Sequence, residues 1–584
     1  MQKHYYTDEK NAQIVIALLK AHGIRKVIAN PGTTNIAFVG SVQNDPWFQV
    51  FSGVDERHSS YMAVGMAAES GEPVVLSCTG ATASRNYLSA LTEAYYRKLP
   101  ILALTSIHHM NSVGNLLPQM LDRRVQMNDV VRYSLQCPVP HTAADERDCV
   151  SNVNKAILEL TRHGGGPVHI NLETDRVSTF GTVELPAYRV IHRTTLASVE
   201  WPKIEPDVKI VVWIGSHRPF SEAATKLLER FVETRSAVVL IDHTSNYRGK
   251  GAINSALLLS QPAREEFYPG LMPDLLIQIG EITGDYSSFG PGYSAKEVWR
   301  VSEDGEARDL FNKLSEVFEM SEENFFAHYA KANDASPSEY FVRWQKADAD
   351  VRSKMPDLPF SNFSISKVLH DKIPSGSRMH FGILNSLRSW NFQTLPKGVY
   401  GSSNVGGFGI DGCVSALIGA SLVRPEQLFF GIIGDLAFFY DLNSLGNRHI
   451  GKNLRILLVN NGCGTEFNLY CHYGSQFGVK TNDFIAAGRH NGNRSRELVK
   501  HYATDLGFKY LVAESQEQFD AVVDEFVDPI SERSIVLECF TEPTDESEAL
   551  YRICHIVTHI PTIKDTIKAA IPCGVKEIIK GLVK

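Results

Sequence analysis

Short apolar runs alternate along the chain with longer segments in which apolar residues recur at helical spacing. Near the N-terminus the runs cover residues 26–29, 49–54, 73–77 and 101–105, and a helical segment at 12–21 precedes them. Gly23 follows that segment, as expected of a residue that ends a helix. Strands that alternate with helices are typical of parallel α/β domains, so the pattern predicts such a domain here.

The same alternation recurs twice further along the chain. A second block has strand-like runs at 209–214, 237–241 and 275–279, and a charged stretch, 303–354, that indicates helix and linker. A third block has runs at 379–383, 428–433, 455–459 and 534–538. We therefore predict an α/β fold of three domains, each a mainly parallel sheet flanked by helices, plus a helical C-terminal tail. The expected boundaries are 1–185, 200–350, 360–544 and, for the tail, 545–584.

Composition narrows the class of protein further. The chain has 584 residues, 43% of them hydrophobic and 21% charged, which predicts a folded protein with a sizeable core. A net charge of −8 gives no support to nucleic-acid binding. We find no leader-like N-terminus and no apolar run long enough for a membrane span. The nine cysteines are scattered without a CxxC pair, which argues against a disulfide framework. We expect a cytoplasmic protein without membrane or nucleic-acid partners.

Polar side chains stand at the ends of two successive strands in the third block. Asp435 ends a strong apolar run, and Asn461 ends the next one, 26 positions later (435 to 461). The two would meet at the carboxyl edge of a parallel sheet, where open α/β sheets bind ligands. Their oxygens, with a nearby backbone carbonyl, suit Mg²⁺, and the N–H groups of the following turns suit a diphosphate. Taken singly, the Asp could cap a helix and Asn-Asn-Gly could be a turn, but the pair favours a metal–diphosphate site.

This pair resembles the cofactor motif of thiamine diphosphate (ThDP) enzymes, in which Gly-Asp is followed one helix and one strand later by Asn-Asn. The third residue of the usual Gly-Asp-Gly is Leu436 here. The resemblance implies ThDP and Mg²⁺ as cofactors, with Asp435, Asn461 and Cys463 as metal ligands. It also implies cofactor contacts from the residues around them: Gly434, Leu436, Ala437, Gly464 and Thr465.

Within this family, three segments look like the 2-succinyl-5-enolpyruvyl-6-hydroxy-3-cyclohexene-1-carboxylate (SEPHCHC) synthases of menaquinone biosynthesis. One is Gly-Asp-Leu-Ala-Phe at 434–438 with Asp-Leu-Asn at 441–443. The others are Gly-Ile-Asp-Gly at 409–412 and Gly-Pro-Val-His-Ile-Asn at 166–171. The resemblance covers roughly residues 10–540 and leaves the tail without a match.

The resemblance also implies a catalytic glutamate after the second strand of the first domain. Glu56 follows the run 49–54 and precedes a segment rich in small residues. In the family this carboxyl group hydrogen-bonds the aminopyrimidine of the cofactor and starts its activation. Burial of the carboxyl group would raise its pKa and help it share a proton. In the family this residue meets the metal site of another chain, so a homodimer or homotetramer with active sites between subunits is implied.

Further positions match the cofactor side of the family's site. They lie in the Pro-Gly loop after the first strand, after the third and fourth strands, and at the start of the third domain. The candidates are Thr33, Thr79, Gly80, Gln119, Asn385, Ser386, Gly409 and Ile410. Ile410 would be the bulky residue under the bent cofactor.

At three places the chain lacks an arginine that SEPHCHC synthases use for their substrates, 2-oxoglutarate and isochorismate. Thr34 stands in the first place, Ile107-His108-His109 replaces an Asp-Arg-Pro in the second, and Val405 follows Asn404 where the family has Asn-Arg-Gly. Each charged contact contributes about 1.5–3 kcal/mol, so the losses argue against a polyanionic acceptor. We therefore expect a ThDP-dependent lyase or transferase that decarboxylates a 2-oxo acid and adds the product to an acceptor other than isochorismate.

The histidine pair His108-His109 is the remaining catalytic candidate. Histidines near the site could transfer protons at neutral pH, although a pair of ordinary surface histidines fits the sequence equally well. Two other outcomes stay open: a simple 2-oxo-acid decarboxylase that releases an aldehyde, and an inactive ThDP-binding partner subunit. A flavin- or nicotinamide-dependent oxidoreductase is disfavoured, because the chain has no GxGxxG fingerprint.

Overall fold

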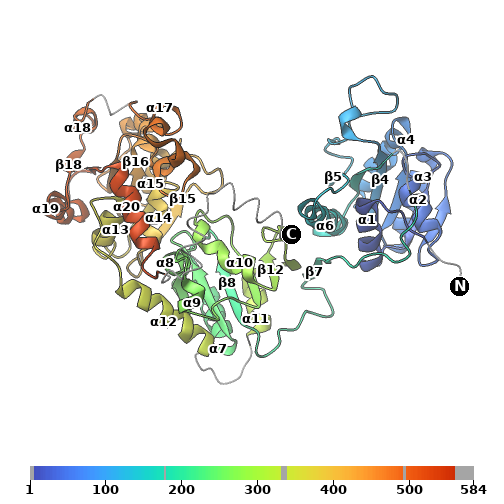
Figure 1. Cartoon of the computed structure of the whole chain (residues 1–584), viewed down its shortest axis with the longest axis horizontal. Helices are drawn as coiled ribbons and strands as arrows, with labels where there is room; N and C mark the ends of the chain where they lie inside the picture. Colours follow the sequence, from blue (N-terminus) through green and yellow to red (C-terminus); the bar gives the residue numbers. More distant parts are fainter. Residues whose placement is uncertain (1–4, 176–178, 331–337, 491–494, 559–584) are drawn as a thin grey trace, which may run out of the picture. The chain divides into compact units, whose positions relative to one another are not determined.

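The computed structural model describes residues 5–175, 179–330, 338–490 and 495–558. The chain divides into two compact units. Unit 1 comprises Met1–Glu205, Leu275–Ile279 and Ala295–His328. Unit 2 comprises Pro206–Asp274, Gly280–Ser294 and Tyr329–Lys584. Three sheets flanked by helices make up the chain, which confirms the predicted α/β class (Figure 1).

The first sheet lies in unit 1 and has six parallel strands in the order β2-β1-β3-β4-β6-β5. The strands are β1 Lys26–Ala29, β2 Gln49–Ser52, β3 Val74–Cys78, β4 Ile101–Ile107, β5 Tyr133–Cys137 and β6 Val168–Glu173. The central strands β3 and β4 are buried along their whole length, which explains why they are uninterrupted apolar runs.

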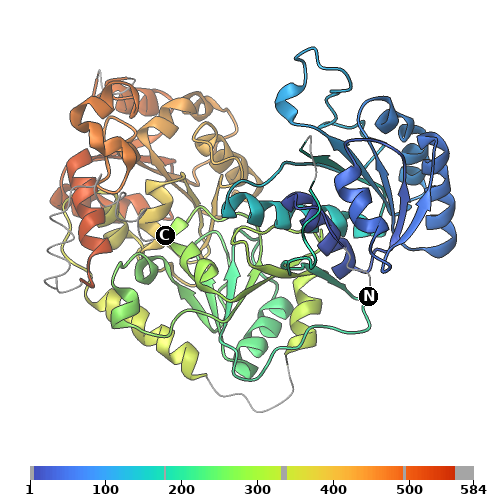
Figure 2. The same ribbon diagram turned by 45° about the vertical axis from the view of Figure 1, so that its right-hand side comes forward.

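Helices cover both faces of the first sheet (Figures 1 and 2). One core cluster joins the sheet to α1 Lys10–Ala21, α2 Ile36–Gln43 and α6 Ala143–Glu159. A second cluster joins the other face to α3 Glu56–Ser70, α4 Thr82–Asn86 and α5 Leu88–Tyr96. The irregular segment between β4 and β5 stands out from the sheet in both views and contains the short 3₁₀ turn Met110–Ser112.

The middle block has seven strands, four of them in unit 1 and three in unit 2. Unit 1 holds the parallel order β11-β12-β13-β7, with bounds β7 His192–Thr195, β11 Leu275–Ile279, β12 Glu297–Ser302 and β13 Leu314–Glu319. Unit 2 holds the parallel order β10-β9-β8, with bounds β8 Ile210–Ile214, β9 Ala237–Ile241 and β10 Ala252–Asn254. The accompanying helices are α7 Glu222–Thr234, α8 Ala256–Leu259, α9 Arg264–Phe267, α10 Gly290–Ser294, α11 Glu322–Tyr329 and α12 Glu339–Ser353.

The third sheet lies in unit 2 and repeats the topology of the first. Its six parallel strands run in the order β15-β14-β16-β17-β19-β18, the same relative order as in the first sheet. The strands are β14 Arg378–Phe381, β15 Tyr400–Ser403, β16 Phe429–Gly434, β17 Leu454–Asn460, β18 Lys509–Ala513 and β19 Ile535–Phe540. The shared order supports the view that the first and third blocks are related domains.

Helices again cover both faces of this sheet. One cluster packs α13 Asn362–Leu369, α14 Asn385–Asn391 and α19 Gln516–Val527 on one face. Another packs α15 Cys413–Val423, α16 Asp435–Tyr440 and α18 Leu498–Asp505 on the other. The remaining helices of this region are α17 Thr481–Phe484 and α20 Pro543–Cys554. Helix α20 is the described start of the predicted tail, and residues 559–584 lie outside the described residues.

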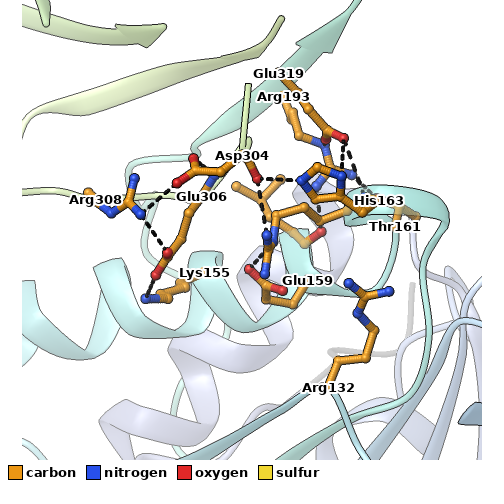
Figure 3. A network of polar contacts seen from close by, with 12 residues as sticks. Arg132, Lys155, Glu159, Thr161, His163, Arg193, Asp304, Glu306, Arg308 and Glu319 are labelled. Atoms are coloured by element: carbon orange, nitrogen blue, oxygen red, sulfur yellow. Dashed lines mark hydrogen bonds and ion pairs between the residues drawn. The ribbon is translucent and has the colours of Figure 1, made fainter. Parts of the chain in front are cut away.

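An ion-pair network within unit 1 joins helix α6 and the turn after it to the segment 304–319 (Figure 3). Lys155 Nζ lies 2.6 Å from Glu306, whose other oxygen pairs with Arg308. His163 Nε2 lies 2.9 Å from the backbone oxygen of Asp304. Arg193 pairs with Glu319 at 3.2 Å. These partners come from segments far apart in sequence. Some charged residues of 303–354 therefore attach this segment to helix α6 and the turn after it.

Several strands were absent from the pattern-based prediction. Most clearly, the charged stretch 303–354 is not only helix and linker, because it contains strand β13. Its sequence, LSEVFE, mixes half-buried polar with buried apolar residues, so it contains no continuous apolar run of the kind used to predict strands. Strand β2 was predicted although its four residues are all exposed. No helix in the described part of the chain is long and apolar enough to cross a bilayer.

Candidate active site

Asp435 lies at the carboxyl edge of the third sheet, and hydrogen bonds hold its carboxylate in place. It follows β16 directly, begins α16, and is 4% exposed. One carboxylate oxygen accepts a hydrogen bond from its neighbour Leu436 N, and the other accepts from Gly462 N, each at 2.8 Å. Because Gly462 follows β17, the second bond ties the two strand ends together. The predicted meeting of the Gly-Asp and Asn-Asn segments is therefore what the structure shows.

The electrostatics of this edge suit a divalent cation. Burial raises the pKa of Asp435 to about 7, with the Glu538 carboxylate adding to the shift and the backbone N–H groups opposing it. Asn461 Oδ1 is buried and has no partner among the described residues. A buried carboxylate and a free amide oxygen are hard ligands whose burial Mg²⁺ would offset. The described residues hold no group of three or more His, Cys, Asp and Glu side chains able to bind a metal, so diphosphate and water oxygens would have to complete the coordination.

The turn after Asn461 lies against the start of α16. Cys463 is buried, and its carbonyl oxygen accepts from Thr465 N at 2.9 Å. Gly464 N donates to Ala486 O, and a Cβ on Gly464 would come within 3.3 Å of the Leu436 side chain. A Cβ on Gly434 would meet nothing within 4 Å. The turn is thus packed from one side, while the space beside Gly434 is open for a ligand.

Helix α14 brings a charged pair to the same edge. Arg388 makes two hydrogen bonds to the Glu466 carboxylate, at 2.8 and 2.9 Å, and a third to Asn385 Oδ1 at 2.8 Å. Ser386 is buried beneath them. Leu384, just before this helix, has a positive φ of 61°, a strained backbone for a residue with a side chain. Such strain is common at ligand sites.

The Gly-Ile-Asp-Gly segment joins this edge through α15. Phe408 also has a positive φ, of 53°, and Ile410 packs on the core cluster that contains α15 and α16. A Cβ on Gly409 would come within 2.4 Å of Asp411 Oδ1, so a larger residue there would require the exposed Asp411 side chain to move. The predicted cofactor-side residues Asn385, Ser386, Gly409 and Ile410 therefore come from segments that pack around the same sheet.

The carboxyl edge of the first sheet gathers the remaining predicted residues. Thr79 Oγ1 lies 2.7 Å from Thr34 Oγ1, which donates to the backbone oxygen of Ser106 at 3.0 Å. A Cβ on Gly80 would come within 3.1 Å of the backbone oxygen of Gln119. The ends of β3 and β4 are thus joined to the loop after β1, and the side chain of Gln119 is exposed beside them.

Glu56 is the first residue of α3, which Asp55 caps by accepting a hydrogen bond from His58 N at 2.9 Å. The buried side chain of Asn30 donates to Gly53 O and Ser59 Oγ, so the end of β1 fixes the start of this helix. Glu56 itself is half-buried and Thr33 is exposed. The full burial expected for the glutamate is not provided by unit 1 alone.

The two histidines after β4 have different surroundings. His108 Nδ1 lies 3.2 Å from the backbone oxygen of Thr174. His109 lies between two carboxylates, with Nδ1 3.1 Å from Glu173 and Nε2 3.3 Å from Asp175. His109 and Glu173 line a cavity of about 360 Å³. An imidazole between two carboxylates can pass a proton from one side to the other.

A charged residue that the sequence reasoning passed over lies behind the first sheet's edge. Arg123 is 1% exposed, and its Nη2 donates to Ser106 O at 2.9 Å, the same oxygen that Thr34 holds. Arg85 is close enough to lower the pKa of Arg123. In the sequence Asp-Arg-Arg looks like solvated charge, and no pattern separates the buried arginine from its exposed neighbour Arg124.

The comparisons with known proteins agree with this geometry. Residues 9–128 match the family model described as "Thiamine pyrophosphate enzyme, N-terminal TPP binding domain". The chain is 30% identical over 565 residues to a 2-succinyl-5-enolpyruvyl-6-hydroxy-3-cyclohexene-1-carboxylate synthase of Phocaeicola vulgatus, with 94% of this chain and 99% of that protein covered. Synthases of the same name from Bacteroides fragilis and Bacteroides thetaiotaomicron are also 30% identical, over 569 and 567 residues, at the same coverage.

These relatives overturn one prediction. The expectation that isochorismate is not the acceptor is wrong, because relatives that align over nearly the whole chain carry the name of the synthase that the argument had set aside. That expectation assumed that a substrate carboxylate must meet arginines at fixed positions along the chain. A carboxylate requires a cation at a place in space, and Arg85 in α4, after β3, and Arg388 in α14, after β14, give each sheet edge a cation.

Proposed function

The chain belongs to the ThDP-dependent family of the SEPHCHC synthases, and from that premise we propose that it decarboxylates 2-oxoglutarate and adds the product to isochorismate. The observation that carries the proposal is the Asp435–Gly462 hydrogen bond with the free Asn461 oxygen beside it. The chain's similarity to the synthases over nearly their full length supports the choice of substrates.

We propose that Asp435, Asn461 and the backbone oxygen of Cys463 bind Mg²⁺. The start of α16 and the turn at Gly464 and Thr465 would then lie beside the diphosphate. Bound ThDP supplies a nucleophilic carbon and an electron sink for decarboxylation. The role of the chain is to hold the metal and diphosphate in one orientation, which the fixed Asp435 carboxylate supports.

Glu56 is proposed as the catalytic acid–base that exchanges a proton with the aminopyrimidine ring. Its place at the start of α3 is set by the Asp55 cap and by Asn30. Thr33, Thr79, Gly80 and Gln119 would line the same half of the cofactor. A second copy of the chain would bury Glu56, so we propose a homodimer or homotetramer with its active sites between subunits.

His109 is proposed to move protons during the addition step. Its two carboxylate neighbours, Glu173 and Asp175, hold the ring in place. His108 is tied to a backbone oxygen and would orient the segment that carries His109.

The domains of the proposal are bounded at 1–185, 200–350 and 360–544. The first and third would contain the first and third sheets, and the second would contain the middle sheet without β7, which precedes residue 200.

The test is a coupled assay with purified protein, ThDP and Mg²⁺. Release of CO₂ from 2-oxoglutarate that depends on isochorismate, with SEPHCHC identified by mass spectrometry, is the expected result. A variant with Glu56→Gln should lose the product, and Glu69→Gln, an exposed residue on the same helix, should keep it. CO₂ release that is indifferent to isochorismate, with no adduct formed, would contradict the proposal.

A further inference from the structure

Arg123 is a buried cation with unused hydrogen-bond donors. Its side chain is among the largest in the protein that are fully buried. Nη2 is bonded to Ser106 O, but Nε and Nη1 are buried and have no partner among the described residues. Buried guanidinium groups are normally paired on all sides, so two free donors on one group call for a ligand.

No acidic side chain in the described part of the chain neutralises this charge. Among the described residues Arg123 makes no ion pair, and the nearest aspartate in sequence, Asp122, is paired with Arg124 instead. Burial lowers the pKa of Arg123 to about 10, with Arg85 lowering it and the Cys78 thiol opposing the shift. The guanidinium therefore keeps its charge at neutral pH, and a second arginine adds to the positive potential.

A small cavity is lined by Arg123. Its volume is about 10 Å³, which limits an occupant to a single small ion or molecule. Arg85 and Arg123 line it together with apolar side chains such as Leu88, Leu91 and Val131, and no carboxylate lines it. His169, also in the lining, is kept neutral because burial and the two arginines lower its pKa to about 3.

We propose that this cavity binds a monatomic anion, chloride or another halide, held by Nε and Nη1 of Arg123. The positive charge and the missing acid require an anion, while the volume excludes a phosphate or the carboxylate of a substrate. The site is separate from the proposed reaction and does not depend on it.

The halide has a structural consequence at the cofactor edge. Arg123 Nη2 and Thr34 Oγ1 share the backbone oxygen of Ser106, and Thr34 contacts Thr79. The anion fixes the guanidinium, and the guanidinium fixes the end of β4. Binding should therefore stabilise unit 1.

The first test is thermal unfolding at constant ionic strength, with sodium chloride replacing sodium gluconate. The wild type is expected to gain about 2 °C or more in Tm, with saturation as chloride rises. Arg123→Met should abolish the difference between the salts. Arg124→Gln, a change to the exposed neighbouring arginine, should keep it. Equal Tm values in both salts, or a chloride effect that survives in Arg123→Met, would overturn the proposal.

A second test keeps the proposal falsifiable if Arg123→Met does not fold. Crystals of the wild type grown in sodium bromide should show an anomalous peak within hydrogen-bond distance of Arg123 Nε or Nη1. A water molecule there, without anomalous signal, would overturn the halide assignment. Displacement of the bromide by 2-oxoglutarate would do so as well, since it would make the cavity part of the substrate site.

Discussion

The carboxyl edges of the first and third sheets have the same strand order but opposite electrostatics. At the third sheet the buried charge is an anion, Asp435, whose two oxygens are bonded to backbone N–H groups of its own unit. At the first sheet the buried charge is a cation, Arg123, with two donors unused, while the acid Glu56 is half-exposed. One topology therefore supports two different kinds of site.

This difference between the two sheet edges indicates which half of the proposed active site is complete within one chain. The third sheet fixes its carboxylate and its Arg388–Glu466 pair by contacts within unit 2. The first sheet presents Glu56 on a well-fixed helix start but leaves its carboxyl group without full burial. We infer that the metal half is preorganised, whereas the proton-transfer half needs a second copy of the chain.

The largest effect should come from Glu56→Gln. Loss of a general acid–base typically lowers turnover by about 10²–10⁴-fold, so product formation should fall by that range. The calorimetric affinity for ThDP with Mg²⁺ should change much less, because the metal ligands are in unit 2. Glu69→Gln is the matched control. If Glu56→Gln turns over normally, the first sheet's edge has no catalytic role.

Asp435→Ala should mainly affect cofactor binding. Removal of a metal ligand is expected to weaken Mg²⁺-dependent ThDP binding by more than about 100-fold, since losing even an outer-shell partner costs about 10–100-fold. Calorimetric titration of metal-stripped protein measures it. Asp524→Asn, an exposed acid paired with Lys372, serves as control. Unchanged affinity in Asp435→Ala would remove the third sheet's edge as the metal site.

The pH dependence of the free energy of unfolding should reveal the cost of burying the Glu546 carboxylate in unit 2. Its Oε1 accepts from Asn362 N and Thr541 Oγ1, and burial raises its pKa to about 7. An acid whose folded pKa is raised stabilises the fold fully below its ordinary pKa and loses that contribution as pH rises through the folded value.

Glu546→Gln keeps the acceptor oxygen and removes the titration. Relative to wild type, its free energy of unfolding should be similar near pH 4.5 and about 3 kcal/mol higher at pH 8. Urea unfolding across this range measures the difference. Glu548→Gln, an exposed residue of the same helix, should show no such trend. A pH-independent difference would mean that Glu546 is ionised without penalty.

The smallest effect is expected for the arginine pair of the third sheet. Glu466→Gln leaves the partly buried Arg388 without its charged partner, as Arg123 is. The change should lower the free energy of unfolding by about 1–3 kcal/mol. Glu532→Gln breaks the exposed pair with Lys452 and should cost less than about 1 kcal/mol. Denaturant unfolding compares the two. Equal losses would show that burial does not distinguish these pairs.

Much of the fold could be predicted from apolar runs. Strands β1, β9 and β11 were predicted with their observed bounds, because buried parallel strands are continuous apolar segments. Strands β5, β13 and β18 were missed, since each mixes buried and half-buried residues and resembles a helix or loop locally. Their place is set by neighbours that are distant in sequence.

The sequence by itself was sufficient to place the residues of the proposed metal edge. Asp435 and Asn461 follow apolar strands at a spacing that only one helix and one strand can fill, so local pattern was sufficient. Which arginines are buried and which are exposed was decided by the tertiary structure. Arg123 and Arg124 are adjacent in sequence, yet one is buried against Ser106 and the other is exposed with Asp122. Burial arises from contacts between distant segments, so the position of an arginine in a motif does not show which groups its side chain meets.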